Sequence, residues 1–264
     1  MAGFFGTEQQ VILQAAAEAA LEWTRRTPGA CDPGRFLGTD DPARLGWDTI
    51  FETLRRDGAF GFRMIPILDT DEVSRRLTEQ AARIDFWDVF MAQRDVAEPA
   101  AASIVAAGLP DGFQYLPDLQ DAEHDDTKAA QDLMAESGIV PFSGSKLVGN
   151  NGPAITVRIG DDAGHLTAVA HAYFPHNAPS PFNRSAWGGL VAVSPMHRGR
   201  GLGKHVNAKL VSECFSRLDA ESIHELAAAT NLPSRKMIEA IGLRLDATLK
   251  CGIAMASDGA RFTK

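Results

Sequence analysis

The chain has 264 residues, enough for one large domain or for a domain of about 150 residues with an extension. Its formal net charge of −8 argues against nucleic-acid binding, because a polyphosphate requires a strong basic patch. The N-terminus lacks a basic region followed by an apolar run, and no stretch approaches the roughly 18 apolar residues of a membrane span. We therefore expect a cytoplasmic monomer or homodimer that binds neither nucleic acid nor membrane.

The cysteines are Cys31, Cys214 and Cys251. An odd number without paired spacing predicts neither a disulfide framework nor a zinc site, and we expect no metal. Cys214 falls on the apolar side of a predicted helix, where we expect a buried, unreactive thiol.

Helical patterns dominate the first part of the chain. Thr7 is placed to cap a helix with apolar residues at three- and four-residue spacing, and a second helix is expected from Asp41 to Arg56. Residues 62–68 are expected to form a strand that Pro66 confines to an edge or to its own end. Another helix is expected from Asp71 to about residue 92. The apolar faces consist of Ile12, Ala15, Ala19 and Trp23 in the first helix, and Val73, Leu77, Ala81 and Ile84 in the last.

From about Gly112, helical and extended patterns alternate, so we divide the chain into a mainly helical region, 1–109, and a second region, 110–264. The elements expected next are a helix (127–137), a turn (149–153), a hairpin (154–160 and 166–174), a loop with three prolines (175–185) and a strand (188–193).

The segment Val191–Lys204 carries the strongest signal in the chain. It reads as a buried strand that ends at Ser194-Pro195, a glycine-rich turn, and a helix that opens near Gly203. Alternating glycines let the backbone N–H groups turn toward one point, where a helix N-terminus adds about half a positive charge. An anion such as pyrophosphate is the natural ligand of this arrangement. The glycine spacing fits neither a dinucleotide-binding fingerprint nor a nucleotide P-loop. The helix places Val206, Leu210, Cys214 and Leu218 on one face.

A second strand–helix pattern follows later in the chain. Residues 223–229 form a short apolar strand, and a helix follows with Pro233 in its first turn and Gly242 at its C-terminal end. A last strand is expected over 245–253.

These residues resemble the acyl-CoA signature of the GNAT superfamily of N-acetyltransferases. Arg198, Gly201 and Gly203 fill the positions of its Arg/Gln-x-x-Gly-x-Gly/Ala pattern. The strand residues Val191, Val193 and Pro195 match as well. In the second stretch Asn231, Ser234 and Gly242 match, Leu243 replaces a phenylalanine, and Ile238 stands where the family has a tyrosine that protonates the CoA thiolate.

The resemblance implies a mixed α/β, GNAT-like acyl-CoA-binding fold over 110–264, preceded by a helical region. Residues 1–109 are then either an extension that packs on this domain and shapes its substrate cleft, or a degenerate second GNAT unit. The implied activity is transfer of an acetyl or short acyl group from acetyl-CoA, or a related acyl-CoA, to an amine of a small molecule or peptide. The implied cofactor-binding residues are Val191, Val193, Arg198, Gly199, Arg200, Gly201, Leu202, Gly203, Lys204, Asn231 and Ser234.

Two proton transfers are needed, and they differ in cost. An amine with a pKa of about 10.4 is protonated at pH 7, and deprotonating it costs about 4.6 kcal/mol. A leaving thiolate with a pKa of about 8.5 costs about 2 kcal/mol. The absence of a tyrosine at Ile238 is therefore tolerable, whereas a missing base is more serious. Many family members place an acid on the strand before the glycine turn, and Trp187-Gly-Gly-Leu190 offers none.

Other side chains are then candidates for catalysis. Period-2 alternation places Val169, His171 and Tyr173 on one strand face, and His171 is either a base or a satisfied structural histidine. His176 lies in the proline-rich loop, and its spacing from His171 does not favour a metal pair. Ser234 either donates to the thiolate or caps its helix. The candidate catalytic residues are His171, Tyr173 and Ser234. A rival interpretation is an acyl-CoA-binding sensor module with impaired catalysis.

Overall fold

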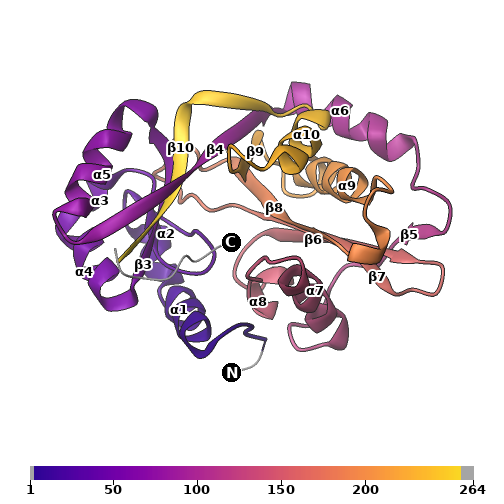
Figure 1. Cartoon of the computed structure of the whole chain (residues 1–264), viewed down its shortest axis with the longest axis horizontal. Helices are drawn as coiled ribbons and strands as arrows, with labels where there is room; N and C mark the ends of the chain where they lie inside the picture. The colour runs from indigo at the N-terminus through magenta and orange to yellow at the C-terminus, as the bar shows by residue number, and fades with distance from the viewer. Residues whose placement is uncertain (1–2, 257–264) are drawn as a thin grey trace.

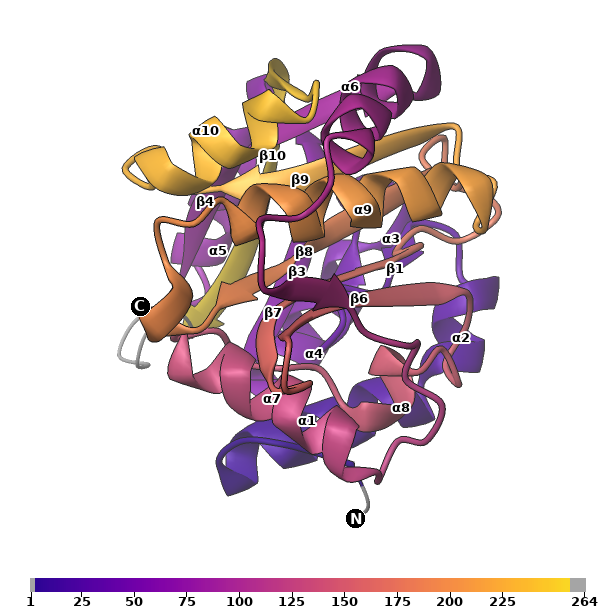
Figure 2. The ribbon, with the colours of Figure 1, turned by 90° about the vertical axis from the view of Figure 1, so that its right-hand side faces the viewer.

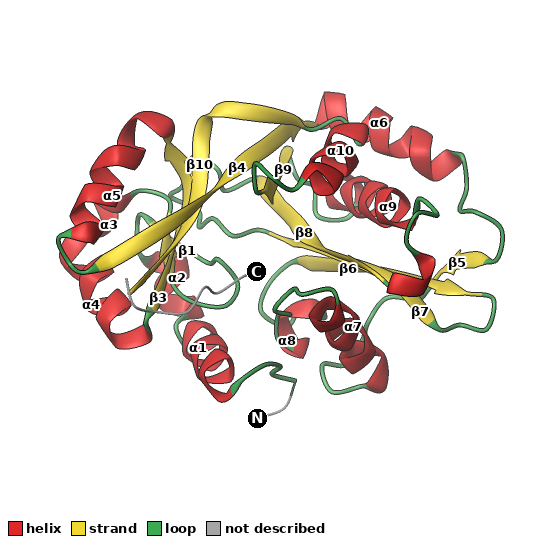
Figure 3. Ribbon diagram, viewed as in Figure 1, coloured by secondary structure: helices red, strands yellow, loops and turns green. Residues whose placement is uncertain are grey.

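The computed structural model describes residues 3–256. Its strands form one mixed sheet in the order β1-β2-β3-β10-β4-β9-β8-β7-β6-β5, with helices packed on it (Figures 1 and 3). The mixed α/β fold expected from the sequence is confirmed. Within the described residues, no helix combines the length and apolar character needed to cross a membrane.

The N-terminal region contains helices and two long strands. The helices are α1 (Glu8–Ala19), α2 (Leu21–Arg26), α3 (Pro42–Leu45), α4 (Trp47–Asp57), α5 (Thr70–Thr78) and α6 (Arg94–Ala106). The strands are β1 (Ala30–Cys31), β2 (Gly38–Thr39), β3 (Ala59–Pro66) and β4 (Ala82–Gln93). Thr7 caps α1 as predicted, because its side chain accepts the Gln10 N–H at 3.3 Å. The helix expected over 41–56 is divided into α3 and α4 at Gly46, whose φ is 92°.

The helix expected from Asp71 to residue 92 is wrong beyond Thr78. Residues 82–93 form β4 instead, which pairs antiparallel with β10 (Arg244–Ala256) on one side and with β9 (Ser222–Ala227) on the other. Hydrogen bonding on both edges explains this outcome, because tertiary pairing overrides the local helical spacing that Leu77, Ala81 and Ile84 continue.

The elements after residue 110 follow the predicted order, with β5 and α8 as additional elements that the sequence analysis did not predict. They are β5 (Phe113–Tyr115), α7 (Asp125–Glu136), α8 (Gly144–Leu147), β6 (Ala154–Asp161), β7 (Leu166–Tyr173), β8 (Ser185–Val193), α9 (Leu202–Ser216), β9, α10 (Leu232–Ala240) and β10. The hairpin β6–β7, the helix α9 after the glycine-rich turn and the last strand are confirmed. In α9 the predicted face of Val206, Leu210 and Cys214 is buried, while Leu218 lies beyond the helix end and is half-buried.

One sheet crosses the boundary expected at residue 110. β4 lies between β10 and β9, so a strand of the first region separates the last two strands of the second. Because β10 is antiparallel to both β3 and β4, these two strands run parallel, and α5 connects them. Around β6 to β9, α6, α9 and α10 cover one face, and α7 and α8 cover the other (Figure 2).

Candidate functional site

The parallel strands β8 and β9 pair only at their beginnings. Ser185, Ala186 and Trp187 pair with Ser222, Ile223 and His224. Beyond this point β8 continues to Val193 paired only with β7, and β9 continues to Ala227 paired only with β4. In the described chain, the β8 edge from Gly188 to Val193 therefore faces no strand, and its backbone groups are open to a ligand.

A bulge lies in this open part of β8. Val169 of β7 pairs with Ala192 and His171 pairs with Gly189, so Leu190 and Val191 stand against the single residue Ala170. Leu190 has a φ of 51°, which is uncommon for a residue with a side chain. Bulges of this kind redirect a strand locally and occur beside functional sites.

The glycine turn, residues 198–203, follows β8 and opens α9. Gly199 and Gly201 have φ values of 80° and 82°, in the left-handed region that favours glycine. Gly201 is the N-cap of α9, and no side chain caps this helix end. The first-turn N–H groups of α9 are therefore free to bind an anion.

Cations surround the glycine turn. Arg198, Arg200 and Lys204 are exposed, and within residues 3–256 none of them forms an ion pair. Arg198 donates weakly to the Val193 carbonyl at 3.3 Å, and Arg200 lies over the Phe113 ring. In a chain with an overall negative charge, this is an unpaired positive patch next to a helix N-terminus.

The end of β8, the start of α9 and the helix α10 converge at Gly203. A Cβ atom at Gly203 would lie 3.4 Å from Met237 Sδ and 3.5 Å from Val193 Cγ2. Asn231 is exposed and caps α10, since its Oδ1 accepts the Ser234 N–H at 3.3 Å. The capping role considered for Ser234 therefore belongs to Asn231, and Ser234 is half-buried in the first turn of α10.

Ile238, in the position of the family's tyrosine, is part of the core. It is 1% exposed and belongs to the apolar cluster between the sheet and α6, α9 and α10, which also contains Ile241 and Leu243. The side chain at this position therefore packs rather than lining an open cleft.

Glu225 is a buried carboxylate at the point where β8 and β9 separate. Its Oε2 accepts the Asn207 Nδ2–H at 3.0 Å, while its Oε1 has no partner in the described residues. Burial raises the pKa of Glu225 from 4.5 to about 7, although the Asn207 hydrogen bond opposes the shift. The sequence did not single out Glu225, because most residues of the predicted strand 223–229 are apolar. The available signal was a single acidic residue within that strand.

His171 and Tyr173 lie on β7 beside this point, opposite Gly189 and Trp187. Burial lowers the pKa of His171 to about 3, helped by Lys146, so its ring is neutral at pH 7. Its Nδ1 lies 2.9 Å from Thr156 Oγ1. The Tyr173 hydroxyl donates to the Asp32 carbonyl at 2.7 Å. Both side chains are thus engaged in the core, and a histidine of such low pKa is a weak base.

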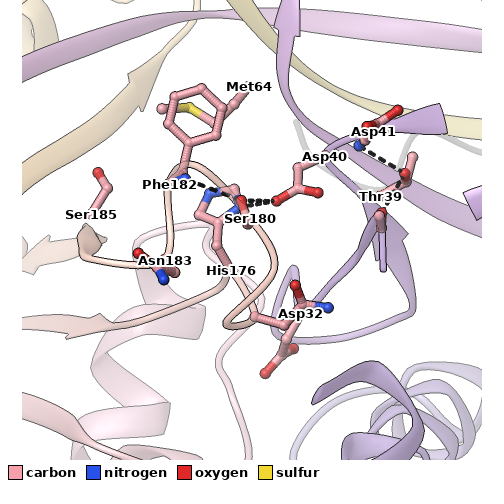
Figure 4. Close-up of polar contacts among 12 residues, drawn as sticks. Asp32, Thr39, Asp40, Asp41, Met64, His176, Ser180, Phe182, Asn183 and Ser185 are labelled. Carbon is pink, nitrogen blue, oxygen red and sulfur yellow. Dashed lines mark hydrogen bonds and ion pairs between the residues drawn. The ribbon is translucent and has the colours of Figure 1, made fainter. Parts of the chain in front are cut away.

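A buried network joins the proline-rich loop to the N-terminal region (Figure 4). His176 Nδ1 and Ser180 Oγ each lie 2.6 Å from Asp40 Oδ2. The side chains of His176 and Asp40 are 0% and 2% exposed. The His176 ring lies 5.7 Å from that of His224, the residue before Glu225. This network therefore positions the loop next to the separation point of β8 and β9.

Part of the chain matches a known protein family. Residues 117–243 match the sequence profile of the acetyltransferase (GNAT) family. No curated protein matches the sequence.

Solved structures agree over nearly the whole chain. A GCN5-related N-acetyltransferase from Kribbella flavida is 14% identical, with a TM-score of 0.60 over 96% of this chain and 99% of that one. A Drosophila protein is 16% identical, with a TM-score of 0.60 over 95% and 90%. A tandem GNAT protein from the clavulanic acid biosynthesis pathway is 13% identical, with a TM-score of 0.54 over 92% and 89%. At these identities the likeness establishes the fold alone. The profile match identifies residues 117–243 as a GNAT-family acetyltransferase domain.

Proposed function

We propose that this protein transfers an acetyl or short acyl group from acyl-CoA to an amine. The observation that carries the proposal is the open edge of β8 that leads into the uncapped N-terminus of α9. An extended ligand arm pairs with a free strand edge as an added strand does, and its phosphates bind at the helix end.

The residues present fit an acyl-CoA. Backbone N–H groups of residues 199–204 would hold the pyrophosphate, with Arg198 and Arg200 as the nearby unpaired cations. Backbone groups of Val191 and Val193 would pair with the pantetheine arm, and Asn231 and Ser234 would border it from α10. The bound cofactor supplies a thioester, which is the activated acyl group.

Glu225 is the base in this proposal. It replaces the acid missing from β8, because it reaches the separation point from the neighbouring strand. A carboxylate with a pKa near the working pH is suited to accept the amine proton, directly or through one water. Its Oε1, which has no partner in the described chain, is the atom that would receive the proton. In this proposal His171 and Tyr173 are structural residues that pack in the core, and they are not catalytic residues.

The proposal also assigns a role to each of the two regions, 1–109 and 110–264. We assign binding of acyl-CoA to residues 110–264 and treat residues 1–109 as a degenerate second GNAT unit. The parallel strands β3 and β4 with their connecting helix α5 support this, because β8, α9 and β9 have the same strand–helix–strand form.

Release of free CoA thiol from acetyl-CoA, measured with a panel of amines, tests the proposal. We expect amine-dependent release, a rate that rises as the pH passes through 7, and a loss of about 10² to 10⁴ in kcat for Glu225→Gln. Acetyl-CoA binding without amine-dependent release would favour the rival sensor module, for which the buried Ile238 is the supporting observation.

A further inference from the structure

Trp187 marks the place where β8 and β9 separate. It is the last residue of β8 that pairs with β9, opposite His224, and the open edge begins at Gly188. On its other side Trp187 pairs with Tyr173 of β7. A ligand arm that pairs with the open edge and runs inward from the start of α9 therefore ends next to Trp187.

The indole of Trp187 lies over the open part of its own strand. A Cβ atom at Gly189 would lie 2.5 Å from Cζ2 and 3.2 Å from Cε2 of Trp187, so a side chain at this position would collide with the ring. Nε1 is bonded directly to Cε2. The edge of the indole that carries the N–H group is thus the edge that lies beside the Gly189 backbone.

Aromatic and apolar residues pack around the rest of the ring. The ring centroids of Phe142 and Tyr173 lie 5.8 and 5.5 Å from that of Trp187, and Leu133 and Met134 of α7 belong to the same cluster. Trp187 is 9% exposed, yet its Nε1 has no hydrogen-bond partner within residues 3–256. A buried indole N–H usually finds an acceptor. An unpartnered donor beside an open strand edge therefore indicates an acceptor that a ligand supplies.

Trp187 and Glu225 lie on opposite faces of the sheet. Gly188 leaves room for Glu225, which bonds with Asn207 of α9, whereas Trp187 is the neighbouring residue along β8 and packs toward α7. This is the alternation of side chains along a strand. A reacting group held between the two strands therefore has a hydrogen-bond donor on one side and a carboxylate on the other.

We propose that the Trp187 Nε1–H group donates a hydrogen bond to the carbonyl oxygen of the thioester. This rests on the proposed function, because the thioester belongs to the acyl-CoA of that proposal. When the amine nitrogen bonds to the carbonyl carbon, one electron pair of the C=O bond moves onto the oxygen, and the indole N–H stabilises the negative charge there. The pair returns to the carbonyl as the C–S bond breaks and the sulfur leaves as a thiolate, while the amine proton passes to Glu225.

Calorimetry with acetyl-CoA and S-ethyl-CoA tests the contact without turnover, because the thioether has a similar size and lacks the carbonyl oxygen. We expect the protein to bind acetyl-CoA about five- to tenfold more tightly, and Trp187→Phe, which keeps a ring and removes the donor, to bind both equally. Gly189→Ala displaces the indole and should lose the same preference. Trp47→Phe is the matched control and should keep it, since Trp47 is half-buried against Phe51 and Phe62 in the N-terminal region. A preference that survives in Trp187→Phe overturns the proposal.

The indole N–H signals of the four tryptophans in a ¹H–¹⁵N spectrum give a direct readout in the unmodified protein. The Trp187 signal is identified by its loss in Trp187→Phe, or by elimination from Phe variants of Trp23, Trp47 and Trp87. We expect acetyl-CoA to move this signal downfield and S-ethyl-CoA to leave it in place. A signal that responds equally to both ligands, as expected if a buried water satisfies the N–H group, contradicts the proposal.

Kinetics separate this proposal from the proposed function. In Trp187→Phe we expect kcat to fall about 10²-fold with a much smaller change in KM, because the bond strengthens as charge develops on the oxygen. A purely structural role would lower stability and leave the preference for the carbonyl ligand unchanged. A carbonyl-dependent preference and signal shift without any release of CoA thiol support the Trp187 contact and remove the transferase. Amine-dependent release that is equal in Trp187→Phe removes the contact and leaves the transferase.

Discussion

Gly188 of β8 leaves room for the carboxylate of Glu225 on β9. A Cβ atom at Gly188 would stand 3.3 Å from both Cγ and Oε1 of Glu225, closer than most side-chain contacts. The strand that lacks its own acid thus has a glycine where the acid of the neighbouring strand lies against it.

Replacing Glu225 by Gln should change how stability depends on pH. The folded-state pKa of Glu225 is raised from 4.5 to about 7, so its contribution to stability is complete below pH 4.5 and is lost as the pH rises through 7. The loss is about 3 kcal/mol, which Glu225→Gln should not show. Urea unfolding of both proteins at pH 4.5, 6 and 8 measures the difference. Parallel pH dependences would mean that Glu225 is ionised freely in the folded protein.

Gly188→Ala should slow the reaction through Glu225. The added methyl group must displace the carboxylate by a few tenths of an ångström, and we expect a loss of about 1 kcal/mol in stability and about tenfold in kcat. The affinity for acetyl-CoA should not change. In the double variant with Glu225→Gln, the Gly188→Ala effect on kcat should disappear. Additive losses would show that Gly188 acts independently of the carboxylate.

Gly203→Val should abolish acetyl-CoA binding, because the side chain would occupy the place where Val193 and Met237 approach the first turn of α9. Gly203→Ala is the control for folding, since its Cβ makes only ordinary contacts and its φ is not positive. Calorimetry gives the affinity, and far-ultraviolet circular dichroism gives the helix content. Unchanged affinity in a folded Gly203→Val protein would remove the glycine turn from the proposed site.

Ile238→Tyr should not restore an acid catalyst. The position is 1% exposed in the main core, and overpacking it costs about 1–3 kcal/mol before the hydroxyl finds a partner. Thermal unfolding and CoA-thiol release measure the two effects, with Ile238→Met as the volume-matched control. A hundredfold rise in turnover would show that thiolate protonation, not amine deprotonation, limits the rate.

Residues 110–264 alone should not fold into a stable domain. Removing the first 109 residues takes away β3 and β4, which are the two strands that pair with β10, and leaves β9 with only β8 beside it. We expect aggregated or unfolded material by size-exclusion chromatography, and recovery when residues 1–109 are coexpressed as a separate chain. A soluble monomer with a cooperative unfolding transition would establish the predicted boundary as an independent domain.

The sequence by itself determined the local features of the second region. A strand, a turn and a helix were predictable from Pro195, the alternating glycines and the apolar face of α9. The turn in particular is visible in the sequence, because the left-handed backbone at Gly199 and Gly201 favours glycine. The cap at Thr7 and the end of β3 at Pro66 were predictable for the same reason: they depend on a few neighbouring residues.

Only the tertiary structure decided the fold of β4 and the environment of Glu225. Residues 82–93 extend because two distant strands pair with them, and helical spacing cannot report a partner more than a hundred residues away. The role of Glu225 could not be predicted for the same reason. Its burial, its hydrogen bond with Asn207 and the space left by Gly188 depend on three separate elements. The pKa of a carboxylate depends on what surrounds it in space, and that environment is fixed only when the chain has folded.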